Sequence, residues 1–124
     1  MKRLLFVDDD VDMLALLREH FDERYEVVTA RDGAAAVERF ARQRPDAVFL
    51  DIGLPGLSGV EVLKRLREAD PSVPVIMLTA NAETLIAEDC LKRGAFGWVP
   101  KPFDLVYLDH MAAAAVDQNP QQPH

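Results

Sequence analysis

The sequence has little of several features that mark specialised classes of protein. Its 124 residues contain one cysteine, Cys90, so an internal disulfide is excluded and a reducing compartment is favoured. No apolar run approaches the length of a membrane-spanning helix, and the run at residues 4–7 is too short for a signal peptide. We therefore expect a cytoplasmic protein without a membrane partner.

Positive charge is also scarce. The chain has 14 Lys and Arg against 21 Asp and Glu, a formal net charge of -7, and never more than two basic residues in a row. Such a charge repels phosphate backbones, so we do not expect direct binding of nucleic acid. A hydrophobic fraction of 49% is enough for a core, and the length suits one domain rather than two.

Five short apolar runs predict buried strands. They lie at residues 4–7, 25–29, 47–50, 75–78 and 96–99, and each is followed by apolar residues at helical spacing. Strands that alternate with helices predict an α/β fold, in which a parallel sheet is covered by helices on both faces. We assign residues 1–116 to this domain. Residues 117–124 are rich in Gln and Pro, and we expect a disordered C-terminal tail or the start of a linker there.

Capping residues indicate where the helices begin. Asp10 and Asp104 precede helical patterns as N-caps, and Ser58 with Glu61 three residues later is typical of a capping box. A further helix is expected over residues 82–93. Its apolar residues predict one stripe at helical spacing, formed by Ala82, Leu85, Ile86 and Cys90.

Polar residues follow four of the five predicted strands. Asp8 and Asp9 follow the first, Asp51 the third and Thr79 the fourth, and Lys101 comes just beyond the fifth. In a parallel sheet the carboxyl ends of the strands share one edge, where ligands of α/β proteins bind, so we expect these side chains to meet. Simpler roles stay open: a solvated acidic turn for the first two acids, turn initiation for Asp51, a helix cap for Thr79 and a surface charge for Lys101.

Together these groups have the chemistry needed to move a phosphoryl group onto a carboxylate. Mg²⁺ prefers carboxylate oxygens, and Asp9 and Asp51 could hold the ion, with Asp8 acting mostly through a bound water. Asp51 would be the nucleophile, because carboxylates do form phosphoryl intermediates. Lys101 would pair with one phosphoryl oxygen as a point charge, and the hydroxyl of Thr79 could donate a hydrogen bond to another.

Several motifs occur in an order and at separations typical of one known family. They are Val7-Asp8-Asp9, Leu50-Asp51-Ile52-Gly53-Leu54-Pro55-Gly56, Leu78-Thr79-Ala80, Gly94-Ala95 and Lys101-Pro102-Phe103. From residue 2 to about residue 116 the chain resembles a response regulator receiver domain of bacterial two-component signalling, similar to the chemotaxis receiver. The resemblance implies a flavodoxin-like, doubly wound (βα)5 fold with strand order 2-1-3-4-5.

The resemblance also implies roles for single residues. A phosphoryl group would pass from a kinase histidine to Asp51, the backbone carbonyl of Gly53 would complete the Mg²⁺ shell, and the Lys101–Pro102 peptide would be cis. Thr79 and an aromatic residue on the fifth strand would form the switch. Trp98 occupies that position, where family members usually carry Tyr or Phe. Side chains at the positions of Gly53 and Asn81 would set how long the phosphoryl group lasts.

The partners implied by the resemblance are proteins. They are a sensor histidine kinase or phosphotransfer protein, and then a downstream protein partner or a fused output domain. A homodimer through the face built by residues 82–93, 96–99 and the last helix is a further family habit. The chain would be a signalling phosphoacceptor that catalyses only its own phosphorylation and dephosphorylation, not an enzyme.

Three other classes deserve comparison. A haloacid dehalogenase-type enzyme also forms an aspartyl phosphate, but its pattern needs a second Asp where this chain has Gly53. A flavin-binding module would need small hydroxyl or Gly residues after the first strand, and the acids at residues 8–10 would repel its phosphate. A receiver-like interaction module that phosphorylation does not regulate stays open because of Trp98, since Trp is frequent at protein interfaces.

Overall fold

The computed structural model describes residues 1–118, apart from the side chains of Asn81 and Gln118. This part of the chain forms five strands, five α-helices and one 3-10 turn, η1. Their bounds are β1 Arg3–Val7, α1 Val11–Phe21, β2 Glu26–Ala30, α2 Gly33–Gln43, β3 Ala47–Asp51, α3 Gly59–Ala69, β4 Val75–Thr79, η1 Asn81–Glu83, α4 Thr84–Lys92, β5 Gly97–Pro100 and α5 Leu105–Gln118.

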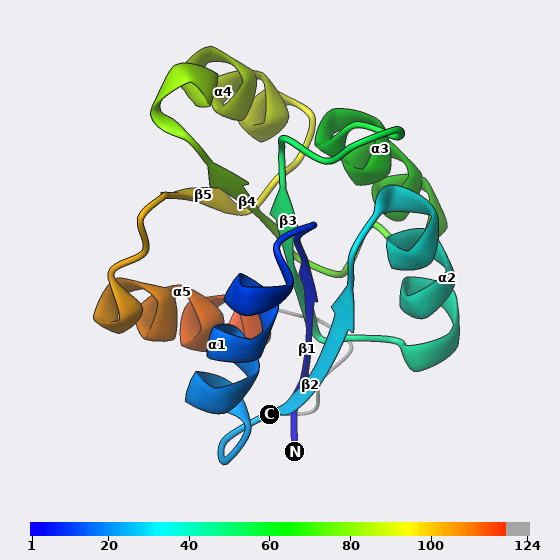
Figure 1. The fold of residues 1–124 in the computed structure, drawn as a ribbon. Coiled ribbons are helices and arrows are strands. Elements are labelled where there is room, and N and C mark those ends of the chain that lie inside the picture. Colours follow the sequence, from blue (N-terminus) through cyan, green and yellow to red (C-terminus); the bar gives the residue numbers. More distant parts are fainter. Residues whose placement is uncertain (119–124) are drawn as a thin grey trace.

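The strands form one parallel sheet of order β2-β1-β3-β4-β5. The helices α1 and α5 cover one face, and α2, α3 and α4 cover the other (Figure 1). The predicted α/β fold, its flavodoxin-like strand order and its helices on both faces are therefore confirmed. Pro100 lies in the edge strand β5, where a missing backbone donor is tolerated.

The two faces of the sheet are filled by different side chains. On the α1 and α5 side the core is aromatic: the Phe6 ring stacks on Phe49 with centroids 4.9 Å apart and lies 5.3 Å from the Phe21 ring. On the other side the core is mostly aliphatic, with residues such as Leu50 and Val62. Burial of both faces explains why β1, β3 and β4 are continuous apolar runs rather than alternating patterns.

The predicted N-caps form, and of the predicted capping box the structure gives the Ser58 half. An oxygen of Asp10 accepts hydrogen bonds from the first turn of α1, and Asp104 does the same for α5. The Ser58 hydroxyl accepts from the Glu61 backbone N–H at 3.3 Å, while the Glu61 carboxylate lies 3.5 Å from Arg65. These side chains satisfy N–H groups that the first helical turn leaves without a partner.

The apolar stripe predicted for residues 82–93 is wrong except at Cys90, which is buried. The segment divides into η1 and α4, and α4 buries only Ala87 and Cys90. Leu85 is 80% exposed and Ile86 is 41% exposed. The 3-10 turn sets where α4 begins and how the helix is rotated about its axis. The residues that face the sheet, three positions apart, are therefore the small residues Ala87 and Cys90.

Gly59 brings the start of α3 against the end of β3. A Cβ atom at this position would lie 2.5 Å from the Asp51 carbonyl oxygen and 2.6 Å from the Cα of Ile52. The Gly59 N–H donates to the Ile52 carbonyl at 3.2 Å. Backbone atoms cannot give way cheaply, so glycine is required for this approach.

The last helix reaches further than the domain boundary expected from sequence. α5 continues to Gln118, two residues into the segment expected as a tail, and residues 119–124 lie outside the described residues. None of the helices in residues 1–118 combines the length and apolar character that a membrane span requires.

Candidate functional site

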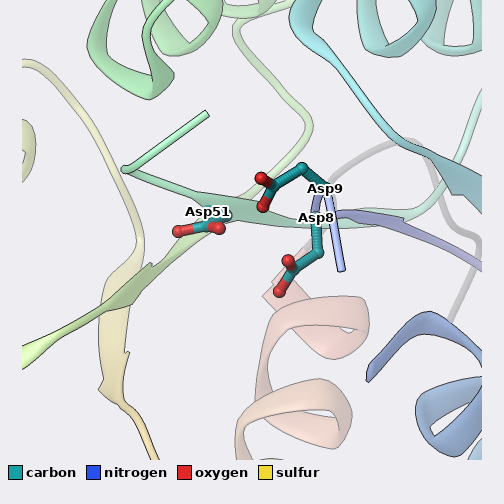
Figure 2. A group of neighbouring side chains, drawn as sticks. All are labelled: Asp8, Asp9 and Asp51. Atoms are coloured by element: carbon teal, nitrogen blue, oxygen red, sulfur yellow. The ribbon is translucent and has the colours of Figure 1, made fainter. Parts of the chain in front are cut away.

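The polar residues at the carboxyl edge of the sheet lie together as expected. Asp8 follows β1, Asp51 ends β3 and Thr79 ends β4, and these three residues are almost completely buried, with exposed fractions of 0%, 5% and 1%. Figure 2 shows the carboxylates of Asp8, Asp9 and Asp51 gathered where β1 and β3 end. Burial of polar side chains among otherwise apolar strand residues is costly unless they are paired, so their partners define the site.

Lys101 supplies the positive charge of the site. Its Nζ lies 3.1 Å from Asp8 Oδ2 and 3.2 Å from Asp51 Oδ2, so one ammonium bridges two carboxylates. The side chain is 27% exposed, which rules out the role of a surface charge. Its backbone N–H donates to the Thr79 carbonyl at 2.7 Å, and the Lys101–Pro102 peptide is cis, as expected.

The three carboxylates fit a hard divalent cation. Asp8, Asp9 and Asp51 each offer one oxygen, and these oxygens all lie within 4.8 Å of one another. Backbone N–H groups fix two of the acids, since Asp10 donates to Asp8 Oδ1 at 3.0 Å and Gly53 donates to Asp51 Oδ1 at 3.1 Å. All three possible metal ligands are carboxylate oxygens, the ligand type that Mg²⁺ prefers.

The protonation of the site is set by burial and by the ion pairs. Burial raises the pKa of Asp8, and the Asp10 N–H and the Lys101 ammonium only partly oppose this. Burial would lower the pKa of Lys101, but its hydrogen bonds and charge interactions with Asp8 and Asp51 outweigh burial and raise that pKa. Lys101 therefore stays a charged ammonium, whereas burial makes the charged form of Asp8 costly.

The remaining expected residues lie around this centre. Gly53 places no side chain over the site: a Cβ there would lie 3.8 Å from Asp51 Oδ1. Trp98 on β5 is half-buried and packs against the core on the side of α2, α3 and α4. Asn81 begins η1, and its side chain lies outside the described residues.

One residue near the site was not expected from sequence. The Glu83 carboxylate accepts a hydrogen bond from the Ala80 backbone N–H at 2.8 Å, and its other oxygen would lie 3.2 Å from a Gly53 Cβ. Glu83 holds the third position of η1, where a side chain can reach back to the cap. The spacing of three residues between Ala80 and Glu83 is that of a capping box. A capping box usually begins with Ser or Thr, however, and Ala80 has no hydroxyl, so the sequence did not indicate this contact.

Comparison with known proteins decides the family. A family model described as the response regulator receiver domain matches residues 4–113. The chain belongs to the response regulator receiver family. Members of this family are signalling phosphoacceptors of two-component systems, and this membership disfavours the alternative of a receiver-like module that phosphorylation does not regulate.

The similar proteins differ in length, so this chain spans most of some of them and only a part of others. Sporulation initiation phosphotransferase F from Bacillus subtilis is 36% identical over 105 residues, which are 84% of this chain and 85% of that protein. Regulatory protein AtoC from Escherichia coli is 37% identical over 117 residues, 94% of this chain but only 25% of AtoC. A solved receiver domain protein from Clostridium thermocellum superposes with a TM-score of 0.92 at 26% identity, covering 95% of this chain and 96% of that one.

Proposed function

We propose that Asp51 of this receiver domain is the phosphoacceptor, and that Asp8, Asp9, Asp51 and the Gly53 carbonyl hold Mg²⁺. The observation that carries the proposal is the Lys101 ammonium bound to both Asp8 and Asp51, with an Asp9 oxygen within 4.8 Å of theirs. At the carboxyl edge of the sheet this arrangement combines a nucleophile, Asp51, with a group of carboxylates that can bind a metal ion and with the positively charged side chain of Lys101.

The transfer that this geometry supports is a direct displacement at phosphorus. A carboxylate oxygen of Asp51 attacks the phosphorus of a phosphohistidine on a sensor kinase or phosphotransfer protein. A P–O bond forms as the P–N bond breaks, the electron pair stays on the imidazole nitrogen, and that nitrogen takes a proton from solvent. When bound, Mg²⁺ offsets the negative charge of the transferred group. Lys101 and the Thr79 hydroxyl hold two of its oxygens.

The output that we propose is a change in protein contacts. Thr79 and Trp98 would pass the state of Asp51 to the face formed by α4, β5 and α5, which would then bind a downstream partner, a fused output domain or a second copy of the chain. The receiver unit, expected over residues 1–116, would extend to the end of α5 at Gln118. The domain would catalyse only its own phosphorylation and dephosphorylation, and the reduced thiol expected of Cys90 suits a cytoplasmic location.

Intact mass after incubation with acetyl phosphate tests the acceptor. We expect one phosphoryl adduct on the wild-type chain in the presence of Mg²⁺, and none when Mg²⁺ is chelated or in Asp51→Asn. Asp22→Asn is the control, because Asp22 is an exposed carboxylate at the far end of α1 and should keep the adduct. The absence of an adduct on a folded wild-type chain would refute the proposal.

The lifetime of the phosphoryl group should depend on Gly53 and Asn81. A side chain at position 53 would begin 3.8 Å from Asp51 Oδ1, where it can screen the phosphoryl group from water or position a water against it. Gly53→Asn is therefore expected to change the half-life of the adduct, measured as loss of the added mass after removal of the donor. An unchanged half-life would exclude this role.

A further inference from the structure

The hydrogen-bond ladder between β3 and β4 stops at the site. Ile52 N–H donates to the Leu78 carbonyl at 3.1 Å, and in a regular parallel ladder the Ile52 carbonyl would then accept from the Ala80 N–H. Instead, the Ile52 carbonyl accepts from Gly59, and the Ala80 N–H donates to Glu83 Oε1 at 2.8 Å. A side-chain carboxylate thus takes the position of one rung between the strand ends.

The second oxygen of Glu83 lies over Gly53, close to Asp51. A Cβ at Gly53 would be 3.2 Å from Glu83 Oε2 and 3.8 Å from Asp51 Oδ1. Because both distances start from the same point, the two oxygens lie within about 7 Å of each other, which is shorter than the Debye length of about 8 Å at physiological salt. The charge of Glu83 therefore acts on Asp51, while the nearby ammonium of Lys101 is already bound to Asp8 and Asp51.

The same contact also holds the start of the segment that follows. Glu83 N–H donates back to the Ala80 carbonyl at 3.0 Å, so Ala80 and Glu83 close η1 by two reciprocal hydrogen bonds. α4 begins at the next residue and buries only Ala87 and Cys90. The position of α4 thus depends strongly on η1, because few apolar contacts hold this helix to the sheet.

We propose that Glu83 is a positioning residue, a displaceable carboxylate that links the charge at Asp51 to the start of α4; this rests on the proposed phosphorylation of Asp51. A phosphoryl group adds about two negative charges and strong acceptor oxygens. It repels Glu83 and competes with it for the Ala80 N–H. Once Glu83 leaves, η1 loses one of its two reciprocal bonds and α4 is released.

Before phosphorylation the carboxylate has two opposite effects. Its negative charge attracts Mg²⁺ to the site and repels an anionic phosphodonor. Removing the charge should therefore weaken Mg²⁺ binding and, at saturating Mg²⁺, speed phosphorylation. A residue that only supported the fold would move both quantities in the unfavourable direction.

Two variants separate the charge of Glu83 from its hydrogen bond. Glu83→Gln keeps an acceptor oxygen for the Ala80 N–H without the charge, and Glu83→Ala removes both. Glu88→Gln, an exposed position on α4, is the control for net charge. For Glu83→Gln we expect phosphorylation by acetyl phosphate to become about threefold to tenfold faster and the Kd for Mg²⁺ to rise about twofold to fivefold. Glu88→Gln should stay within about twofold of wild type in both measurements.

Thiol labelling of Cys90 measures the release of α4. Cys90 lies on the buried face of α4, is fully buried and is the one cysteine of the chain, so its reaction with a thiol reagent reports opening of α4. We expect faster labelling in unphosphorylated Glu83→Ala and in phosphorylated wild type, but not in unphosphorylated Glu83→Gln.

The proposal and the proposed function fail in different ways. If Glu83→Gln matches Glu88→Gln in rate and in Mg²⁺ affinity, the carboxylate does not act through its charge and the inference is wrong. If Glu83→Ala leaves Cys90 as protected as in wild type, the link to α4 is wrong. A wild-type chain that forms no adduct would overturn the proposed function, while Mg²⁺ titration and labelling of the unphosphorylated variants still test Glu83.

Discussion

Asp8 is fully buried and Asp109 is partly buried, and their environments shift their pKa values in opposite directions. Asp8 lies at the carboxyl edge of the sheet, where burial raises its pKa despite the nearby Lys101. Asp109 lies on α5, facing α1. Burial alone would raise the pKa of Asp109, but hydrogen bonds from Arg24 and His20 outweigh it and lower that pKa. At the site the folded protein disfavours the charged form of Asp8. At the contact of α1 with α5 it favours the charged form of Asp109, so that charge stabilises the fold.

The contact of α1 with α5, which we call the α1–α5 seam, adds ion pairs to a hydrocarbon core. Phe21 is fully buried beside Phe6, and the Arg24 guanidinium lies 5.3 Å from the centre of the Phe21 ring. His20 Nε2 and Arg24 Nη2 lie 2.7 Å and 2.9 Å from the same oxygen of Asp109, Oδ1. Most of the stability on this side should therefore come from the aromatic core, because ion pairs that remain partly exposed contribute little.

The largest expected effect is at the aromatic core of the seam. Phe21→Ala should lower the free energy of unfolding by about 3–5 kcal/mol, since a fully buried ring is replaced by a cavity. Urea unfolding followed by circular dichroism measures this. Leu85→Ala on α4 is the matched control, because Leu85 is 80% exposed and its removal should cost no more than about 0.5 kcal/mol. Equal losses in the two variants would show that α4 is held as firmly as α1.

A smaller effect of opposite sign is expected at the site. Asp8→Asn should raise the free energy of unfolding at neutral pH by about 0.5–2 kcal/mol, the range common for single stabilising substitutions, because the variant no longer buries a charged carboxylate. The same change should weaken Mg²⁺ binding, since one of the three carboxylates is lost.

The pH dependence of this gain follows from the raised pKa of Asp8. Folded Asp8 takes up a proton more readily than the unfolded chain, so wild-type stability falls as pH rises from the ordinary value of 3.8 through the raised pKa. The advantage of Asp8→Asn should be complete above that window and absent below it. Urea unfolding over a pH series without Mg²⁺ measures it, and a variant less stable than wild type at neutral pH would contradict the comparison.

The smallest effect is expected at the ion pairs of the seam. Asp109→Asn should lower the free energy of unfolding at neutral pH by about 0.2–1 kcal/mol, as is typical of partly exposed pairs. Because the pKa of Asp109 is lowered, this contribution is present above the ordinary value of 3.8 and is lost as pH falls through the lowered pKa. The same pH series gives both curves, and a loss that persisted at acid pH would assign the effect to packing instead.

The sequence predicted the features that depend on local pattern and topology. Apolar runs gave the strands, and the convergence of parallel strand ends placed Asp51 near Lys101, 50 residues further on. Adjacent acids could not be told apart in the same way: Asp8 is buried and Asp9 is exposed, because the chain turns just after β1. The orientation of α4 and the reach of Glu83 depend on one 3-10 turn, whose backbone the residue types alone do not determine.

Gly59 has a consequence for how the chain can be redesigned. The missing methyl group lets the backbone of α3 press on the Asp51 carbonyl, at 2.5 Å from where a Cβ would be. In a randomised library, this position should accept glycine alone, whereas Gly56, with nothing within 4 Å of its Cβ position, is limited only by its positive φ of 71°. A protein engineer who wished to re-aim the proposed acceptor would have to reshape a helix start that never touches the phosphoryl group.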